Sequence, residues 1–570
     1  MKNKTFRSDF SDLFRNLRFT VPIILVALFG YGYTFGKLSI SVDDMTAERY
    51  TLGDELLSQG RYTAVLFKRF FGLYRNVPHF GDMLCVLLFI VAMYVFAVVL
   101  MRASDYKLRT SSLALFACLT LSYSLMNEIY VYNGGNINVT LGFFLTSFAL
   151  YFTQEFFRNK KKYNLICSLL LLIAVVSLYE SFVIVYTISC ISILILGYYY
   201  KKDGINGKFG KTLLRGIIML IPIVLAIVIE YFLGKGINAI FDIGQSDYIA
   251  NESYWFQDTS TFTDIIRHFA ESLIYNYIIA SKFYLPIRTM VIASNLVFIY
   301  GIVEGIRKRN ITIALLYIAP LVVICAFNLV LGRIAGNRMC QYYAVFVAFF
   351  VMLAYEKLLD DFRKVKREKV KKVGTVAVCF FAALLVFYQT YDLNAWLCLD
   401  VRRYEYEKEL VTSVCEELYK NYDIENKQVL FIGNAYLGDT LMEECSYTAD
   451  DPFVIKVADI LENFDSELAE NIRTLNGKER RSFLQTNLTS YIYWANYAFS
   501  EPNAEIEKFC KFLGFDKINF CDNEYVLRAA NFETRIMNAW PQEGSITEEG
   551  DYIVVNFGSI SAIEEMFDED

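Results

Sequence analysis

The chain has 570 residues, of which 55% are hydrophobic and 20% are charged, and its formal net charge is -6. Its mean hydropathy is +0.34, which is too apolar for an ordinary soluble enzyme of this length. Basic residues gather in the connections between apolar stretches and acidic residues gather in the last third of the chain. No nucleic-acid partner is indicated, because the basic residues form no single patch.

Apolar stretches of about twenty residues, nearly free of charge, recur before residue 391, and a helix needs about that length to cross the hydrocarbon of a membrane. They cover residues 19–35, 83–101, 214–233, 291–306, 311–331 and 373–390. Basic clusters on both sides of residues 165–200 indicate that the chain crosses and returns within this stretch. We therefore predict about 11 transmembrane helices. The first apolar run is long and lacks a small-residue cleavage site, so it is predicted to be a retained helix and not a signal peptide.

Lys and Arg of short loops stay preferentially on the cytoplasmic side of a membrane. The basic clusters occur at alternate connections, at residues 2–18, 102–109, 158–162, 201–211, 307–309 and 363–372. This alternation places the N-terminus on the cytoplasmic side of the membrane and the segment after residue 391 on the extracytoplasmic side. The loops 37–80, 127–137, 234–285 and 332–340 are expected on the same outer face.

The segment after residue 391 has regularly spaced charges and short apolar runs. A helix is predicted over 402–419, a strand ending at Gly433-Asn434, and a strand pair around 519–527 and 551–557. The fold class is therefore membrane all-α, with a small C-terminal extracytoplasmic α/β domain. We expect two domains, a polytopic membrane domain over 1–391 and the α/β domain over 392–570.

Cysteine and histidine offer few candidates for a metal site. The 12 Cys are scattered without metal-ligand spacing, and the 2 His are too few for a histidine metal site or a Ser-His-Asp triad. Cys510 and Cys521 have two open interpretations, an extracytoplasmic disulfide or two buried free thiols.

Two adjacent carboxylates, Asp43 and Asp44, follow the first predicted helix at the outer face. Carboxylates at the mouth of a helical bundle can act as a general base on a substrate hydroxyl, or together hold a divalent cation such as Mg²⁺ or Mn²⁺. The structural alternative is that one of them caps a helix over 45–58.

Further ionisable residues fall on the same predicted face, namely Glu128, Glu180, Arg333 and Arg338. Ionisable groups next to hydrocarbon are costly unless they are hydrated or paired, so their position is informative. The planar fork of Arg suits a phosphate, which predicts substrate binding by these four residues. The alternative is that the carboxylates simply neutralise the Arg residues.

Several segments resemble the bacterial membrane glucosyltransferases of the phage GtrII type, within the GT-C superfamily. They are the basic N-terminus and the first helix leading into Ser39-Ile40-Ser41-Val42-Asp43-Asp44, then Ser58-Gln59-Gly60-Arg61-Tyr62, Tyr179-Glu180-Ser181-Phe182, Met537-Asn538-Ala539-Trp540-Pro541 and Gly544-Ser545-Ile546. The resemblance covers most of the chain. Arg333 and Arg338 match no fixed motif of the family, so their predicted phosphate role comes from chemistry alone.

The resemblance implies transfer of a hexose, most simply glucose, from a polyprenyl-phosphate donor to a cell-surface glycan such as O-antigen or teichoic acid. It implies that Asp43 or Asp44 is the catalytic base, while a metal stays open because lipid-phosphate donors do not always need one. The alternatives are a polysaccharide polymerase or ligase and a lipid-linked-sugar flippase. A flippase typically has inverted repeats and helices broken at the midplane, and the sequence shows neither.

Overall fold

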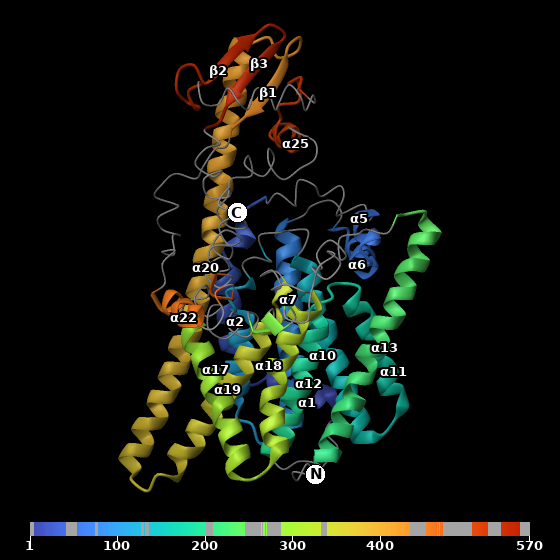
Figure 1. Ribbon diagram of the computed structural model, residues 1–570, viewed down its shortest axis with the longest axis vertical. Coiled ribbons are helices and arrows are strands. Elements are labelled where there is room, and N and C mark those ends of the chain that lie inside the picture. The colour runs from blue at the N-terminus through green and yellow to red at the C-terminus, as the bar shows by residue number, and fades with distance from the viewer. Residues whose placement is uncertain are drawn as a thin grey trace.

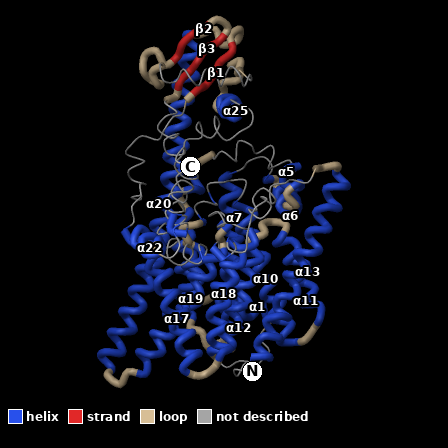
Figure 2. Tube along the Cα trace, viewed as in Figure 1, coloured by secondary structure: helices blue, strands red, loops and turns tan. Residues whose placement is uncertain are grey.

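The computed structural model describes residues 5–40, 54–73, 78–126, 130, 136–200, 209–244, 287–331, 339–433, 452–463, 504–521 and 537–558, with short pieces at 264–270 and 466–470. A bundle of helices fills the larger part of the molecule, and one long helix, α20, leads from it to a small sheet (Figure 1). The N-terminus lies at the opposite end of the bundle. Figure 2 shows that the strands are confined to the tip of α20.

The structure is mainly helical, as the sequence predicts. The helices are α1 Phe6–Phe14, α2 Leu17–Tyr31, the short 3-10 helix η1 Thr34–Gly36, α5 Asp54–Ser58, α6 Tyr62–Phe71, α7 Pro78–Ala103, α8 Thr110–Leu121, α10 Asn136–Asn159, α11 Lys162–Val176, α12 Phe182–Tyr199, α13 Phe209–Phe241, α17 Ile287–Arg307, α18 Ile311–Leu331, α19 Tyr342–Lys364, α20 Glu368–Asn421, α22 Pro452–Glu462 and α25 Ala504–Phe512.

Short connections make successive helices run in opposite directions, which gives the bundle two distinct ends. The connections 160–161, 308–310 and 365–367 lie at the end farther from the sheet, which we call the basic end. The turn 177–181 and the last residues of α2 and α8 lie at the other end, which we call the sheet end.

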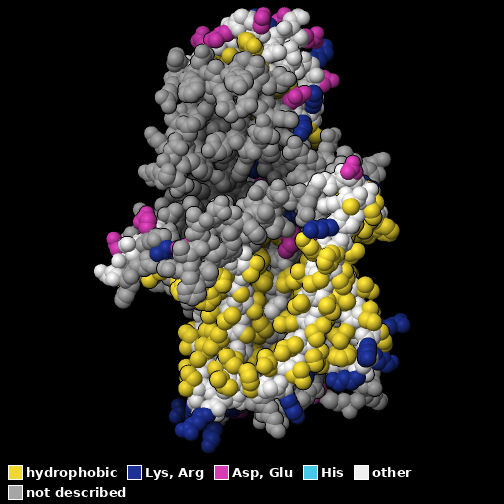
Figure 3. All heavy atoms as spheres, turned by 45° about the vertical axis from the view of Figure 1, so that its right-hand side comes forward, with side chains coloured by type: hydrophobic (Ala, Val, Ile, Leu, Met, Phe, Trp, Pro, Cys, Tyr) yellow, Lys and Arg dark blue, Asp and Glu magenta, His cyan; other side chains and the backbone are white. Residues whose placement is uncertain are grey.

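Six of the described helices are long and apolar enough to cross a membrane, or seven if the bent pair α1 and α2 counts as one span. The helices α8 and α11 are apolar but shorter. These properties fit a membrane protein, whereas the predicted count of about 11 spans is not confirmed. Figure 3 shows a broad band of hydrophobic side chains over the bundle, with Lys and Arg gathered below it at the basic end.

The centre of the bundle is formed by α7, α8, α12 and α19, whose apolar side chains are mostly buried. At the basic end, Arg102 of α7 is buried and joins two other helices, because its Nε lies 2.6 Å from Asp9 Oδ2 and its Nη1 contacts Glu155. In contrast, the outer surface of α13 and the apolar half of α20 expose large hydrophobic side chains, as expected where a helix faces lipid.

The small sheet has three strands in the order β1-β3-β2, namely β1 Gln428–Ile432, β2 Ile546–Glu549 and β3 Tyr552–Asn556. β1 and β3 are parallel, with Gln428 opposite Tyr552, and β2 and β3 are antiparallel. Cys510 and Cys521 are buried free thiols, and the sulfur of Cys510 lies 3.6 Å from that of Cys415 instead.

Two predictions about the C-terminal segment need correction. The helix predicted over 402–419 is the last part of α20, because no Pro or Gly interrupts the chain between Gly374 and Asn421. The predicted partner of strand 551–557 is also wrong within the described residues: β3 pairs with β1 and β2, and segment 519–521 contributes only a bridge from Phe520 to Val429. The rest of that predicted strand, 522–527, lies outside the described residues.

The contact between α10 and α12 depends on Gly142. A Cβ added there would lie 2.4 Å from Cε2 of Phe182, whose side chain is fully buried and has little room to move. We expect Gly142→Ala to lower the free energy of unfolding by about 1–3 kcal/mol through overpacking. The measurement is the melting temperature of the purified chain in detergent.

Gly236→Ala is the matched control, because it lies inside α13 and has no atom within 4 Å of an added Cβ. Alanine should leave the melting temperature unchanged there or raise it slightly, since Ala favours a helix more than Gly does. Equal melting temperatures of the two variants would contradict the tight contact.

Candidate active site

One of the six predicted site residues, Glu180, lies in the described part of the chain. Asp43, Asp44, Glu128, Arg333 and Arg338 lie outside the described residues. The described residues that flank their loops can still be located, and they lie at the sheet end of the bundle. The site is therefore built from these flanking residues and from the turn that carries Glu180.

The turn between α11 and α12 contains Glu180 and is bonded to the start of α19. The hydroxyl of Ser181 donates a hydrogen bond to Oε1 of Gln341, and both side chains are fully buried. Gln341 directly follows the loop 332–340 and precedes the first residue of α19. The Glu180 turn is thus joined to the end of the loop that contains the two predicted phosphate ligands.

The segment that begins α6 packs against the same turn. The guanidinium carbon of Arg61 lies 5.0 Å from the ring centre of Tyr179, a cation-π contact. Thr63 and Ser177 also share a hydrogen bond between their hydroxyls. The two segments Ser58–Tyr62 and Tyr179–Phe182, which lie more than a hundred residues apart in the sequence, are therefore in contact.

Gly60 allows this segment to approach α13. Its φ is +77°, a conformation that favours glycine, and a Cβ added there would lie 3.0 Å from Oε1 of Glu230. Glu230 is close enough to Glu180 for the two carboxylates to repel each other. On the neighbouring α6, burial raises the pKa of the Tyr62 phenol.

This cluster combines two carboxylates, one guanidinium group and the phenols of Tyr62 and Tyr179 in a partly buried position. The carboxylates can accept protons or hydrogen bonds from sugar hydroxyls, the guanidinium group can bind an anion, and the Tyr62 phenol stays protonated at neutral pH and can donate a hydrogen bond. Glu230 was not among the predicted site residues. The available signal was a single carboxylate within the apolar stretch 214–233, and such a residue indicates function by default.

The chain that leads to Asp43 is fixed to α20. The hydroxyl of Ser39 donates to Asp400, and Nη2 of Arg403 donates to the carbonyl oxygen of Ile40 over 3.0 Å. Arg403 also pairs with Asp400 at 2.9 Å and with Glu407 at 2.7 Å, and the three charged side chains are at most 4% exposed. We call Asp400, Arg403 and Glu407 the α20 anchor. It holds the backbone three residues before Asp43.

A weaker, exposed contact extends this attachment. Nζ of Lys37 lies 3.2 Å from Oε1 of Glu405, and this hydrogen bond raises the pKa of the Lys37 ammonium group. Exposed ion pairs of this kind contribute little to stability, so the α20 anchor is the main attachment of residues 37–40 to α20.

Other polar contacts at the sheet end join α2, α7, α8, α10 and α20. Tyr31 at the end of α2 donates to the carbonyl oxygen of Leu121, and its ring centre lies 4.5 Å from that of Tyr130, two residues after Glu128. Ser124 donates to Asp392 of α20. Between α7 and α10, Asn136 donates to the buried Asp82 over 2.8 Å. These contacts join the end of α2 and α20 to the residues on either side of 127–129.

The C-terminal segments of the resemblance lie elsewhere, next to the sheet. The backbone N–H of Trp540 donates to the carbonyl oxygen of Asn556 in β3, and its indole N–H donates to Ser413 of α20 over 3.1 Å. The described contacts of segments 537–541 and 544–546 are with β3 and the last part of α20, and they pack the C-terminal sheet.

Among the described residues, no three His, Cys, Asp or Glu side chains come together in a way that could hold a metal ion. Asp43 and Asp44, the predicted ligands of a divalent cation, lie outside these residues.

The α20 anchor generates a stability prediction. Arg403→Met leaves Asp400 and Glu407 buried without their counter-charge, which should cost about 3–5 kcal/mol of unfolding free energy. Adding Asp400→Asn and Glu407→Gln removes the unpaired charges and should restore much of the melting temperature. Lys37→Met, which breaks only the exposed pair, should leave it unchanged. An unaltered melting temperature in Arg403→Met would show that the anchor does not hold this segment.

The helices that carry this site match a known protein family. The family model described as Glucosyl transferase GtrII matches residues 32–359, which is more than half of the chain and includes the turn of Glu180 and both contact segments around it. No curated protein matches the chain. The match agrees with the resemblance found in the sequence, and the chain belongs to the GtrII glucosyl transferase family.

Proposed function

We propose that this glucosyltransferase moves glucose from a polyprenyl-phosphate donor to a cell-surface glycan at the outer face of a bacterial cell membrane. The observation that carries the proposal is that Arg61, Tyr179 and Glu180 and the flanks of the other candidate loops all lie at the sheet end of an apolar bundle. A donor anchored by a polyprenyl chain presents its sugar phosphate at the surface of the hydrocarbon layer, which is where this end of the bundle would lie.

In this proposal Asp43 or Asp44 is the catalytic base. An acceptor hydroxyl is a poor nucleophile until a carboxylate takes its proton in the transition state. The α20 anchor supports this role because it fixes Ile40, and three residues of chain can span at most ~11 Å. The base would thereby stay close to the end of α2 and to α20. A divalent cation at the same pair of carboxylates remains compatible with this arrangement.

Glu128, Glu180, Arg333 and Arg338 are proposed to bind the donor and the acceptor. The side chain of Gln341 is hydrogen-bonded to the Glu180 turn, and Arg338 lies three residues before Gln341. Since three residues of chain span at most ~11 Å, the guanidinium group of Arg338 would lie near the turn. A guanidinium group there would stabilise the polyprenyl phosphate as it leaves. Arg61 and Glu230, which the structure adds to this cluster, are further candidates for sugar or phosphate contacts.

The orientation is part of the proposal. Exposed Lys and Arg residues cover the basic end, for instance at 363–367, and Figure 3 shows them below the hydrophobic band. The positive-inside bias would put that end, with the N-terminus, in the cytoplasm. The sheet end would then face the glycan acceptor, and the segment after residue 391 would form an outer domain for acceptor recognition.

The first test measures glucose transfer from radiolabelled polyprenyl-phosphate glucose to a cell-envelope acceptor fraction, with Asp43→Asn and Asp44→Asn compared with the unchanged chain. Asn keeps the size of Asp and caps a helix about as well, so the capping interpretation predicts almost no loss. If one Asp is the base, its Asn variant should lose roughly 10²- to 10⁴-fold in turnover.

Asp105→Asn is the control for this test. Asp105 lies at the basic end with φ +56°, a conformation that Asn tolerates well. The Asp105→Asn variant should therefore transfer glucose as fast as the unchanged chain. Near-normal transfer by both variants at positions 43 and 44 would refute the base assignment. Transfer from a nucleotide sugar but not from the polyprenyl-phosphate donor would refute the proposed donor.

The second test concerns orientation. Two variants are made in a background in which the native Cys are replaced, Lys366→Cys at the basic end and Glu549→Cys in β2. Each variant carries a single thiol, at an exposed position of one end. A membrane-impermeant maleimide applied to intact protoplasts should label the thiol at position 549 and not that at 366. The reverse labelling would place the site on the cytoplasmic face and exclude an outer acceptor.

A further inference from the structure

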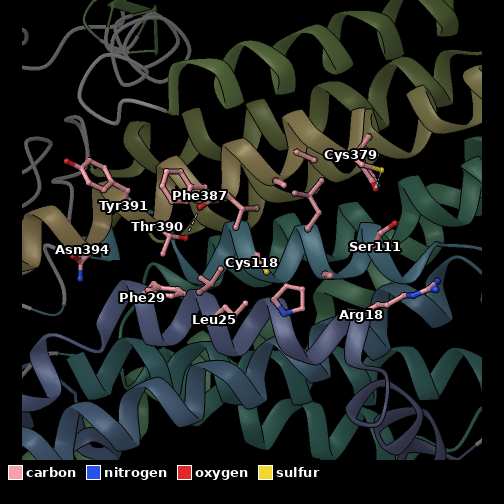
Figure 4. Close-up of a pocket in the computed structure, with 18 residues that line it drawn as sticks. Arg18, Leu25, Phe29, Ser111, Cys118, Cys379, Phe387, Thr390, Tyr391 and Asn394 are labelled. Atoms are coloured by element: carbon pink, nitrogen blue, oxygen red, sulfur yellow. Dashed lines mark hydrogen bonds between the residues drawn. The ribbon is translucent and has the colours of Figure 1, made fainter. Parts of the chain in front are cut away.

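The second half of α20 extends far beyond the bundle. The residues of α20 up to Asn394 line an apolar pocket beside α2 and α8, and Figure 4 shows Tyr391 and Asn394 at one end of this pocket. Cys415 lies ~32 Å farther along the same unbroken helix, at 1.5 Å per residue. This distance exceeds the depth of a whole hydrocarbon core, which is about 30 Å, so Cys415 belongs to the part of the chain outside the layer.

At this level α20 packs against α25, and the contact brings two thiols together (Figure 1). The sulfurs of Cys415 and Cys510 lie 3.6 Å apart, and both side chains are fully buried. They are surrounded by buried apolar side chains of the two helices, namely Val411, Val414, Leu418, Ile506 and Phe509. Close packing leaves these side chains little freedom, so the two sulfurs are held next to each other. A disulfide joins its sulfurs at ~2.0 Å, which requires an approach of only ~1.5 Å.

Another thiol near α25, Cys521, lies on the opposite face of the sheet. Cys521 is buried with Leu430 of β1. Cys510 is buried with Val429 of the same strand. Because successive side chains of a strand point to opposite faces, the sheet separates Cys521 from Cys510. The geometry therefore favours Cys415 over Cys521 as the partner of Cys510.

We propose that Cys415 and Cys510 form a disulfide bond that ties α25 to α20 at the outer face of the membrane. This inference rests on the orientation that is part of the proposed function, because thiols stay reduced in the cytoplasm and disulfides persist in oxidising surroundings outside it. The oxidant is the disulfide of an extracytoplasmic thiol oxidase. One thiolate of the chain attacks that disulfide, and the second thiolate then displaces the oxidase as its dithiol. Two thiols thereby lose two protons and two electrons, and the oxidase gains them.

Burial determines when this bond forms. The neighbouring Cys415 and burial raise the pKa of the Cys510 thiol well above its ordinary value, so the folded domain contains little thiolate at neutral pH. Disulfide exchange requires a thiolate, and it requires access to the sulfur. The bond therefore forms while α25 docks onto α20, before both sulfurs are buried. Once formed, it is shielded from reductants in the surroundings.

The disulfide closes a loop of the chain that returns to the bundle between its two ends. β1 belongs to this loop, and so does α22, whose Ala458 is buried in the apolar core of the bundle. A crosslink that closes a long loop removes conformational freedom from the unfolded chain. The bond between Cys415 and Cys510 thus stabilises the connection that runs from the sheet to the bundle and back to α25.

The test detects the bond in the full-length chain. Cells that produce it are denatured in excess maleimide, which caps free thiols, and the purified chain is digested without reductant. Mass spectrometry should find the peptides of Cys415 and Cys510 joined, two hydrogen atoms lighter than their sum, and separate after reduction. Cys415→Ser should lose the joined peptides, whereas the matched control Cys521→Ser should keep them. Maleimide on both Cys415 and Cys510, or Cys510 joined to Cys521 or Cys445, would overturn the assignment.

The orientation measurement separates failure of the disulfide from failure of the proposed function. If Cys415 and Cys510 are capped by maleimide while a thiol at position 549 reacts from outside the cell, the disulfide is refuted and the orientation stands. If they are capped and the thiol at position 549 is shielded in intact protoplasts, the proposed orientation fails and the disulfide fails with it. Joined peptides in a chain that transfers no glucose would support the disulfide while refuting the proposed reaction.

Discussion

The cost of placing a charge in hydrocarbon determines where this protein can carry chemistry. A helix that faces lipid satisfies its own backbone, but a carboxylate or guanidinium group within the layer needs a partner or water. The described charges follow this rule. Arg102 and Arg403 are buried only with carboxylate partners at the two ends of the bundle, whereas the outer surfaces of α13 and of the apolar half of α20 carry hydrophobic side chains. Reactive groups are thereby concentrated at the bundle ends.

Within that constraint α20 connects three features of the molecule. Its apolar half packs against α2 and α19 in the bundle, the α20 anchor holds the segment before Asp43, and its last turns pack against α25 and the sheet. Since one continuous helix has little freedom to bend without a Pro or Gly, these features keep a fixed spacing along its axis. The catalytic proposal and the position of the sheet therefore depend on the same element.

The sequence predicted what hydropathy and charge determine, and missed what depends on contacts between distant segments. The membrane character, the small C-terminal sheet and the family were predicted, because apolar runs and short motifs are local signals. Glu230 was missed although a single carboxylate within an apolar stretch is a local signal; its contact with the segment of Gly60 could not be read from the sequence. The predicted partner of strand 551–557 was wrong within the described residues because β3 pairs with β1, which lies more than a hundred residues earlier in the chain. The domain boundary at residue 391 was inferred from composition and stays a prediction, while α20 itself continues from Glu368 to Asn421.

The unbroken course of α20 has a further consequence for access to the acceptor. From Tyr391 to Asn421 the helix extends ~45 Å beyond its apolar half. A helix of that length acts as a spacer of set height, so the sheet stands well above the bundle and not on it (Figure 1). Any molecule that binds the sheet is therefore held at this distance from the bundle. A long, chain-like molecule could then reach both the sheet and the bundle end at once, whereas a single sugar could not.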